Sequence, residues 1–239
     1  MTKDRNQDQD EDKANYWIFG YGSLIWKPPP HTDKRVTGFV RGYVRRFWQS
    51  SVDHRGTPEY PGRVVTLIPY DEWKEMNDIH ESYEDEVVWG VAYHIQPEKV
   101  EEVKEQLGIR EQNGYSVHYL PIYEHPSSTS PIVPRATTYI GMTSNEAFVG
   151  PPPRNDQDEL ARRILKSKGP SGRNREYLYN MAKALRELSP ETRDPHIFDL
   201  EKRAMRLEKE EGLGLSTKEK REMKEDTEEE MENLPPLKN

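Results

Sequence analysis

A glycine-rich turn directly after an aromatic run is the first stretch of this sequence with the chemistry of a binding site. Residues 16–26 read Tyr-Trp-Ile-Phe-Gly-Tyr-Gly-Ser-Leu-Ile-Trp, and their aromatic and β-branched side chains predict a buried strand. At Gly20 and Gly22 the missing side chains leave backbone N–H groups open to a close approach by a ligand. Such amides between apolar walls suit an anion or a carboxylate, although a plain glycine turn between two strands has the same pattern.

Glu111 stands apart from the charged runs that hold most of the acidic residues. It follows an expected helix that ends near Gly108, and it precedes the turn signal Asn113-Gly114 and an aromatic strand. If Glu111 is half-buried there, its pKa is raised toward the range of a general base. The alternative is a surface carboxylate with an ordinary pKa, and the residues by themselves leave both open.

Three familiar kinds of chemistry do not fit the sequence. From Gly20 the pattern is Gly-x-Gly-x-x-Ile, without the third glycine of a dinucleotide-binding fingerprint, and there is no Walker lysine. Ser23 lacks the glycine two residues later that a nucleophile elbow requires. The 7 histidines have no pair at metal-ligand spacing, and the sequence contains no cysteine for a thiolate site or a nucleophile.

The period of the apolar positions around these residues predicts an α+β protein. Besides the strand that begins at Tyr16, strands are expected at 36–44, 46–51, 62–68, 87–95, 116–123 and 135–141. Helices are expected from Pro97 to Gly108, over 156–168, after a turn at 169–174, and from His196. A polar turn at 53–58 separates two of the strands.

Composition and charge restrict the classes of function. The chain has 239 residues, a net charge of -8 and 33% charged residues, and its mean hydropathy is -1.05. Nucleic acid is not expected as a partner, because phosphate binding needs a basic face. No apolar run approaches the roughly 18 residues that span a bilayer, and the N-terminus has no signal-peptide core. We therefore expect a cytoplasmic protein that has no membrane partner.

The charge is concentrated at the two ends, so the folded part is expected to be smaller than the chain. Residues 1–14 are expected to form a disordered acidic tail. The folded domain is expected at 15–207, with an acidic insertion at 70–86 between two strands. Residues 208–239 are expected to form a charged tail that is either helical or disordered.

Six stretches of this sequence form a recognisable set of motifs. One is Arg110-Glu111-x-x-Gly114-Tyr115. The others are 19–27, 45–50 together with 53–56, 61–67, 88–93 and 169–178. Together, and in this order along the chain, they resemble the ChaC-like, glutathione-specific γ-glutamylcyclotransferases. The resemblance covers about residues 16 to 200, and neither the acidic insertion nor the two tails interrupt a motif.

The resemblance implies cleavage of the γ-glutamyl linkage of reduced glutathione to 5-oxoproline and cysteinylglycine. It implies a small closed or nearly closed β-barrel with helices packed around it, and it places the catalytic glutamate at Glu111. The implied substrate-binding residues are Gly20, Tyr21, Gly22, Ser23, Leu24 and Ile25. No cofactor and no metal are expected, since the α-amine of the substrate is itself the nucleophile and one carboxylate can move the proton.

Several roles stay open. Amides of the Gly22 turn either fix the α-carboxylate or stabilise the oxyanion. Tyr115 either lines the pocket or belongs to the core. The arginines at 45, 46 and 63 either bind the glycine carboxylate of glutathione or form structural ion pairs. The alternatives for the whole chain are a cyclotransferase that acts on other γ-glutamyl compounds and a non-catalytic γ-glutamyl-binding module, and the oligomeric state is not predicted.

Overall fold

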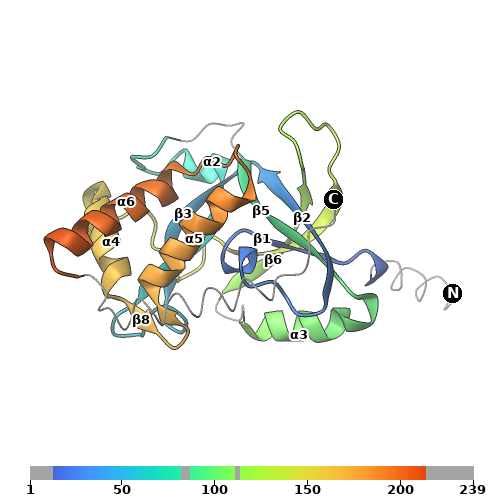
Figure 1. Ribbon diagram of the computed structural model, residues 1–239, viewed down its shortest axis with the longest axis horizontal. Helices are drawn as coiled ribbons and strands as arrows, with labels where there is room; N and C mark the ends of the chain where they lie inside the picture. Colours follow the sequence, from blue (N-terminus) through green and yellow to red (C-terminus); the bar gives the residue numbers. More distant parts are fainter. Residues whose placement is uncertain (1–12, 82–86, 111–113, 214–239) are drawn as a thin grey trace.

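The computed structural model describes residues 13–81, 87–110 and 114–213, which form an α+β fold (Figure 1). The strands are β1 (Trp17–Gly20), β2 (Thr32–Arg41), β3 (Tyr43–Ser51), β4 (Gly62–Pro69), β5 (Val87–Ile95), β6 (Tyr115–Ile122), β7 (Val133–Gly141), β8 (Lys168–Gly169) and β9 (Gly172–Arg173). The α-helices are α2 (Tyr70–Trp73), α3 (Val100–Arg110), α4 (Gln157–Lys166), α5 (Asn174–Leu188) and α6 (Pro195–Glu210). Three 3₁₀ turns are η1 (Ser23–Ile25), η2 (Pro97–Lys99) and η3 (Pro153–Asn155).

The central strand β5 covers the same residues, 87–95, as the sequence predicts. It is hydrogen-bonded to β1 on one side and to β2 on the other, which explains why its apolar run is almost continuous. One expected boundary is wrong. The first strand ends before Gly42, where φ is +76°, and not between residues 44 and 46. Strand β2 therefore ends at Arg41, and β3 begins at Tyr43.

The expected closed or nearly closed β-barrel is not confirmed. In the described ranges, five strands form one sheet in the order β2-β5-β1-β7-β6, and β3 pairs with β4 in a separate sheet. The outer strands β2 and β6 approach each other, but they meet through a single bridge between Phe39 and Tyr123. Strand β6 ends at Ile122, so no ladder continues from that bridge to close the sheet.

Helices cover the strands from two directions (Figure 1). Helix α3 buries Val100, Val103 and Leu107 in a small core with Ile18 and Ile95 of the five-stranded sheet. Helices α4, α5 and α6 pack against one another at the other end of the molecule and contribute to the larger core.

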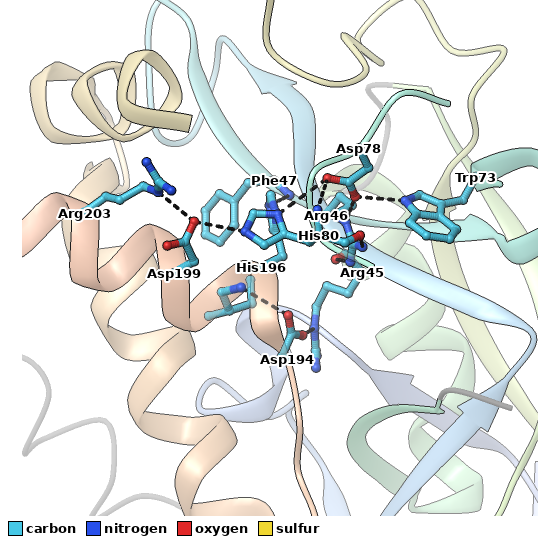
Figure 2. Close-up of polar contacts among 11 residues, drawn as sticks. Arg45, Arg46, Phe47, Trp73, Asp78, His80, Asp194, His196, Asp199 and Arg203 are labelled. Carbon is cyan, nitrogen blue, oxygen red and sulfur yellow. Dashed lines mark hydrogen bonds and ion pairs between the residues drawn. The ribbon is translucent and has the colours of Figure 1, made fainter. Parts of the chain in front are cut away.

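Strand β3 is attached to α6 through a cluster of buried polar groups, which Figure 2 shows. Nε2 of His196 accepts a hydrogen bond from the backbone N–H of Phe47 (3.0 Å), so the ring proton of neutral His196 lies on Nδ1. That atom faces Nδ1 of His80 at 3.3 Å, and Nε2 of His80 lies 3.0 Å from Asp199 of α6. Burial, followed by the charge of Arg46, keeps the pKa of His196 well below its usual range.

Arg46 and Asp78 form the ionic part of this cluster. Nε of Arg46 lies 2.5 Å from Oδ2 of Asp78, and both side chains are buried. The same oxygen accepts from the indole N–H of Trp73 at 3.0 Å. Burial by itself raises the pKa of Asp78, but its contacts with His80 and Arg46 outweigh burial and hold that pKa well below its usual value. The described part of the expected acidic insertion, 70–81, is thus tied to β3.

Candidate active site

A cavity of about 360 Å³ lies between the end of β1, the end of β3 and the start of α5. This volume is within the range of small-molecule sites. Its wall consists of Phe19, Gly20, Tyr21, Gly22, Ser23, Leu24, Lys27, Gln49, Ser50, Ser51, Asp53, His54, Arg55, Val64, Val65, Tyr115, Tyr139, Ser171 and Tyr177.

Five of the six expected binding residues line this cavity, and one does not. Residues 20–24 form part of the wall. Ile25 is buried in the larger hydrophobic core instead. The difference follows from the 3₁₀ turn η1, in which successive side chains point about 120° apart. Because Leu24 lines the cavity, the next side chain, Ile25, points toward the core.

The backbone of the glycine-rich turn is held from behind by buried side chains. The hydroxyl of Tyr93 donates to the carbonyl of Leu24 at 2.7 Å and to that of Ile25 at 3.1 Å. Burial raises the pKa of Tyr93, so this phenol stays a donor at neutral pH. Arg45 donates through Nη1 to the carbonyl of Tyr21 at 2.7 Å, and its Nε pairs with Asp194 at 2.8 Å. The turn is therefore fixed before any ligand binds.

Two of the three arginines considered for the glycine carboxylate are structural. Arg45 and Arg46 are both buried in ion pairs, with Asp194 and Asp78 respectively, and neither belongs to the cavity wall. Arg63 is half-buried and also lies outside the wall, with Nη1 donating to the carbonyl of Gly62 at 2.9 Å. Burial lowers the pKa of Arg63, with a further contribution from the charge of Arg163.

The polar turn expected at 53–58 lies against the hairpin of β8 and β9 and brings charged groups to the opposite wall. Nδ1 of His54 lies 3.2 Å from the Ser171 hydroxyl. Nη1 of Arg55 donates to the carbonyl of Arg173 at 3.0 Å and lies 3.5 Å from Glu176. Asp53, His54 and Arg55 all contribute to the wall.

Tyr115 lines the cavity, which settles its role in favour of the pocket. Glu111, the expected catalytic residue, lies outside the described residues. It is four positions before Tyr115, so its Cα is at most on the order of 14 Å from that of Tyr115 along a fully extended chain. Helix α3 continues to Arg110 and does not stop at the predicted Gly108.

Gln49 is a wall residue that the sequence did not single out as a site residue. Its side chain is 1% exposed, and Oε1 has no hydrogen-bond partner among residues 13–81, 87–110 and 114–213. Buried side-chain oxygens usually have such a partner. In the sequence, Gln49 is a polar residue directly after the aromatic pair Phe47-Trp48. A polar residue in a strand more often faces solvent, so this position did not indicate a cavity wall.

Two further features concern the described ranges alone. Within them, no group of three or more His, Cys, Asp or Glu side chains is placed to hold a metal ion. None of the helices there is long and apolar enough to cross a membrane.

The fold and the cavity agree with the comparison to known proteins. A family model described as ChaC-like protein matches residues 16–207, and the chain belongs to this family. A protein of Schizosaccharomyces pombe named glutathione-specific gamma-glutamylcyclotransferase is 45% identical over 189 residues, which cover 79% of this chain and 92% of that protein. A protein of Saccharomyces cerevisiae with the same name is 42% identical over 207 residues, which cover 74% of this chain and 88% of that protein.

The crystal structure of a selenomethionine-labelled yeast γ-glutamyl cyclotransferase specific to glutathione is similar to this chain, with a TM-score of 0.70 and 37% identity. The similarity covers 80% of this chain and 96% of the yeast chain. The α+β fold is therefore that of a γ-glutamylcyclotransferase.

Proposed function

We propose that this protein is a glutathione-specific γ-glutamylcyclotransferase, a lyase that converts reduced glutathione into 5-oxoproline and cysteinylglycine. The observation that carries the proposal is the cavity wall formed by residues 20–24, in a chain whose relatives bear that name. The glycine-rich turn holds the γ-glutamyl group, and the cysteinylglycine half extends toward the wall of Asp53, His54 and Arg55.

The reaction needs a proton acceptor and a folded substrate, and no external nucleophile. The α-amine attacks the γ-carbonyl carbon, so a C–N bond closes a five-membered ring while the C–N bond to cysteine breaks. Glu111 takes the proton from the amine and gives it to the leaving nitrogen, so that no water is consumed. Holding the γ-glutamyl chain in the attack geometry supplies up to about 7–11 kcal/mol of the barrier reduction.

The location of Glu111 at this site is part of the proposal. It is supported by Tyr115, which lines the cavity only four residues later. The start of β6 is thereby fixed at the wall, because Tyr115 pairs with Gly141 of β7. We propose that the Glu111 carboxylate, on the connection between α3 and β6, reaches the bound amine.

The proposal is tested by incubating the purified protein with reduced glutathione and following the release of cysteinylglycine, with γ-glutamyl-alanine as comparison substrate. We expect turnover of glutathione and much slower turnover of the dipeptide. Turnover of the dipeptide alone would indicate a cyclotransferase for other γ-glutamyl compounds. Ligand binding without any turnover would indicate a γ-glutamyl-binding module, and either result would contradict the proposal.

A further inference from the structure

The outer face of α6 carries a stripe in which apolar and basic side chains alternate. Helices α5 and α6 lie side by side at one end of the molecule (Figure 1), and a groove of about 500 Å³ lies on α6 and reaches Arg186 of α5. Four residues of α6 that line this groove form one helical face, the α6 stripe, at i, i+4, i+7 and i+11: Phe198, Lys202, Met205 and Lys209. Met205 is 48% exposed. Apolar side chains that recur on an outward helix face are the pattern of a surface that another helix covers.

The acidic side chains of the groove are already neutralised, whereas the two lysines of the α6 stripe are not. Glu201 and Glu210 are each paired with an arginine of the groove. Lys202 and Lys209 are exposed, and neither has a hydrogen bond or an ion pair within residues 13–81, 87–110 and 114–213. The uncompensated charge of the stripe is therefore positive. Such a surface suits an acidic partner that carries apolar residues at a matching period.

The last part of the sequence has this combination of charge and period. Residues 214–239 lie outside the part of the chain that the structure describes. Six of the eight residues at 225–232 are acidic, and none of them is basic. The least polar residues around them have the spacing of one helical face, at i, i+4, i+8 and i+11: Met223, Thr227, Met231 and Leu234. The segment 223–234 is thus complementary to the α6 stripe in charge and in period.

The segment is also long enough and close enough to reach the stripe. The described chain ends at Leu213, three positions after α6, and the carbonyl of Leu213 accepts a hydrogen bond from Nη1 of Arg175 at 2.6 Å. The α6 stripe and the face of the segment both extend over eleven positions, which is about 16 Å in a helix. The intervening residues 214–222 can span on the order of 30 Å. They are sufficient to turn the chain back along α6.

We propose that residues 223–234 bind antiparallel to α6 on the α6 stripe of the same chain, with acidic side chains toward Lys202 and Lys209. Apolar residues of the segment then cover Phe198 and Met205. Because the charges on both sides are exposed, salt weakens this contact. The inference does not depend on the cavity, so it stands or falls separately from the proposed function.

Cross-linking of the full chain with a carbodiimide tests the proposal, because this reagent joins a lysine amine directly to a carboxylate in contact with it. We expect a cross-link within one chain from Lys202 or Lys209 to residues 225–232. The cross-link should be lost at about 1 M salt, where charges are screened beyond about 3 Å. Lys34 of β2 and Lys104 of α3 are exposed control lysines. Cross-links spread evenly over all four lysines, or none to the α6 stripe, would overturn the proposal. A cross-link between two chains would identify a second copy as the occupant and would also overturn it.

An exchange of charges provides a second readout. Lys202→Glu combined with Lys209→Glu should raise the rate at which a protease of low specificity cleaves within the segment by about 3- to 10-fold, because two exposed ion pairs are lost. Adding Asp226→Lys and Glu230→Lys, at positions that border the apolar face of the segment, should return the rate to that of the wild type. The same reversal at the two control lysines should leave the rate unchanged. Equal rates in the stripe and control variants, or no recovery after the exchange, would contradict the contact.

Discussion

The cluster around His196 and the wall of the cavity both contain buried polar side chains, but of the two only the wall borders space that a ligand can occupy. Each nitrogen of the Arg46 guanidinium has an acceptor, and both oxygens of Asp78 are used. Both nitrogens of His80 and of His196 have a polar neighbour. In the cavity wall, Ser51 and Arg55 also have protein partners, but they line the cavity. A saturated network away from the cavity stabilises the fold, whereas polar groups that line a cavity are available to a ligand.

The largest effect on turnover is expected from a substitution of Glu111, the proposed proton acceptor. Glu111→Gln preserves the shape of the side chain and removes its basicity, so kcat should fall at least about 100-fold and up to about 10,000-fold. The Tm should stay near that of the wild type. Glu105→Gln, at an exposed position of α3, serves as the matched control and should leave both quantities unchanged. Near-normal turnover of Glu111→Gln would show that the proton acceptor lies elsewhere.

A substitution in the cluster around His196 should lower stability and leave turnover nearly unchanged. Asp78→Ala leaves the buried guanidinium of Arg46 without its counter-ion, so the free energy of unfolding should fall by about 3–5 kcal/mol. Under conditions where the variant is folded, kcat/KM should stay close to the wild-type value. Urea unfolding and steady-state kinetics check the two halves of this expectation.

Asp71→Ala is the matched control. Asp71 lies seven residues before Asp78 and forms an exposed pair with Lys74, so its removal should leave the free energy of unfolding nearly unchanged. If Asp78→Ala lost its activity without losing stability, the division between a structural cluster and a binding wall would be wrong.

A smaller effect is expected from pH. The pKa of His196 is lowered in the folded protein, so below the unfolded value of about 6.5 the unfolded chain binds a proton that the folded protein does not. The stability is therefore complete above pH 6.5 and decreases as the pH falls below it, with a slope of at most about 1.4 kcal/mol per pH unit for this group.

Urea unfolding between pH 8 and pH 5 measures this slope. His196→Gln lowers the stability at every pH but should flatten the curve between pH 6.5 and 5, whereas the exposed control His125→Gln should leave it unchanged. A slope that persists in His196→Gln would show that another group causes the acid sensitivity.

Local patterns in the sequence were sufficient for most elements and for the glycine-rich turn. The run from Val87 to Ile95 predicts β5 with its full length, and residues 20–24 of the predicted glycine-rich turn line the cavity. These features depend on neighbours in the chain, on side-chain period and on glycine, all of which the sequence displays directly.

The remaining features depend on contacts between distant residues. The packing of the Gln49 side chain against Gly141, 92 positions later, is visible only in the folded structure. The structural roles of Arg45 and Arg46 depend on acidic partners at 194 and 78. The closed barrel was expected from the family resemblance, but the pairing of β2 with β6 is limited to one bridge. Contacts between residues so far apart in the chain cannot be inferred from the local pattern of one sequence.

In the proposed reaction the substrate's own amine, and not water, cleaves the γ-glutamyl bond at this cavity. The most direct test is a product balance for the wild-type protein with reduced glutathione, in which 5-oxoproline, glutamate and cysteinylglycine are quantified together. We expect one 5-oxoproline and one cysteinylglycine for each glutathione consumed, with no glutamate. Formation of glutamate in place of 5-oxoproline would identify hydrolysis and would contradict it.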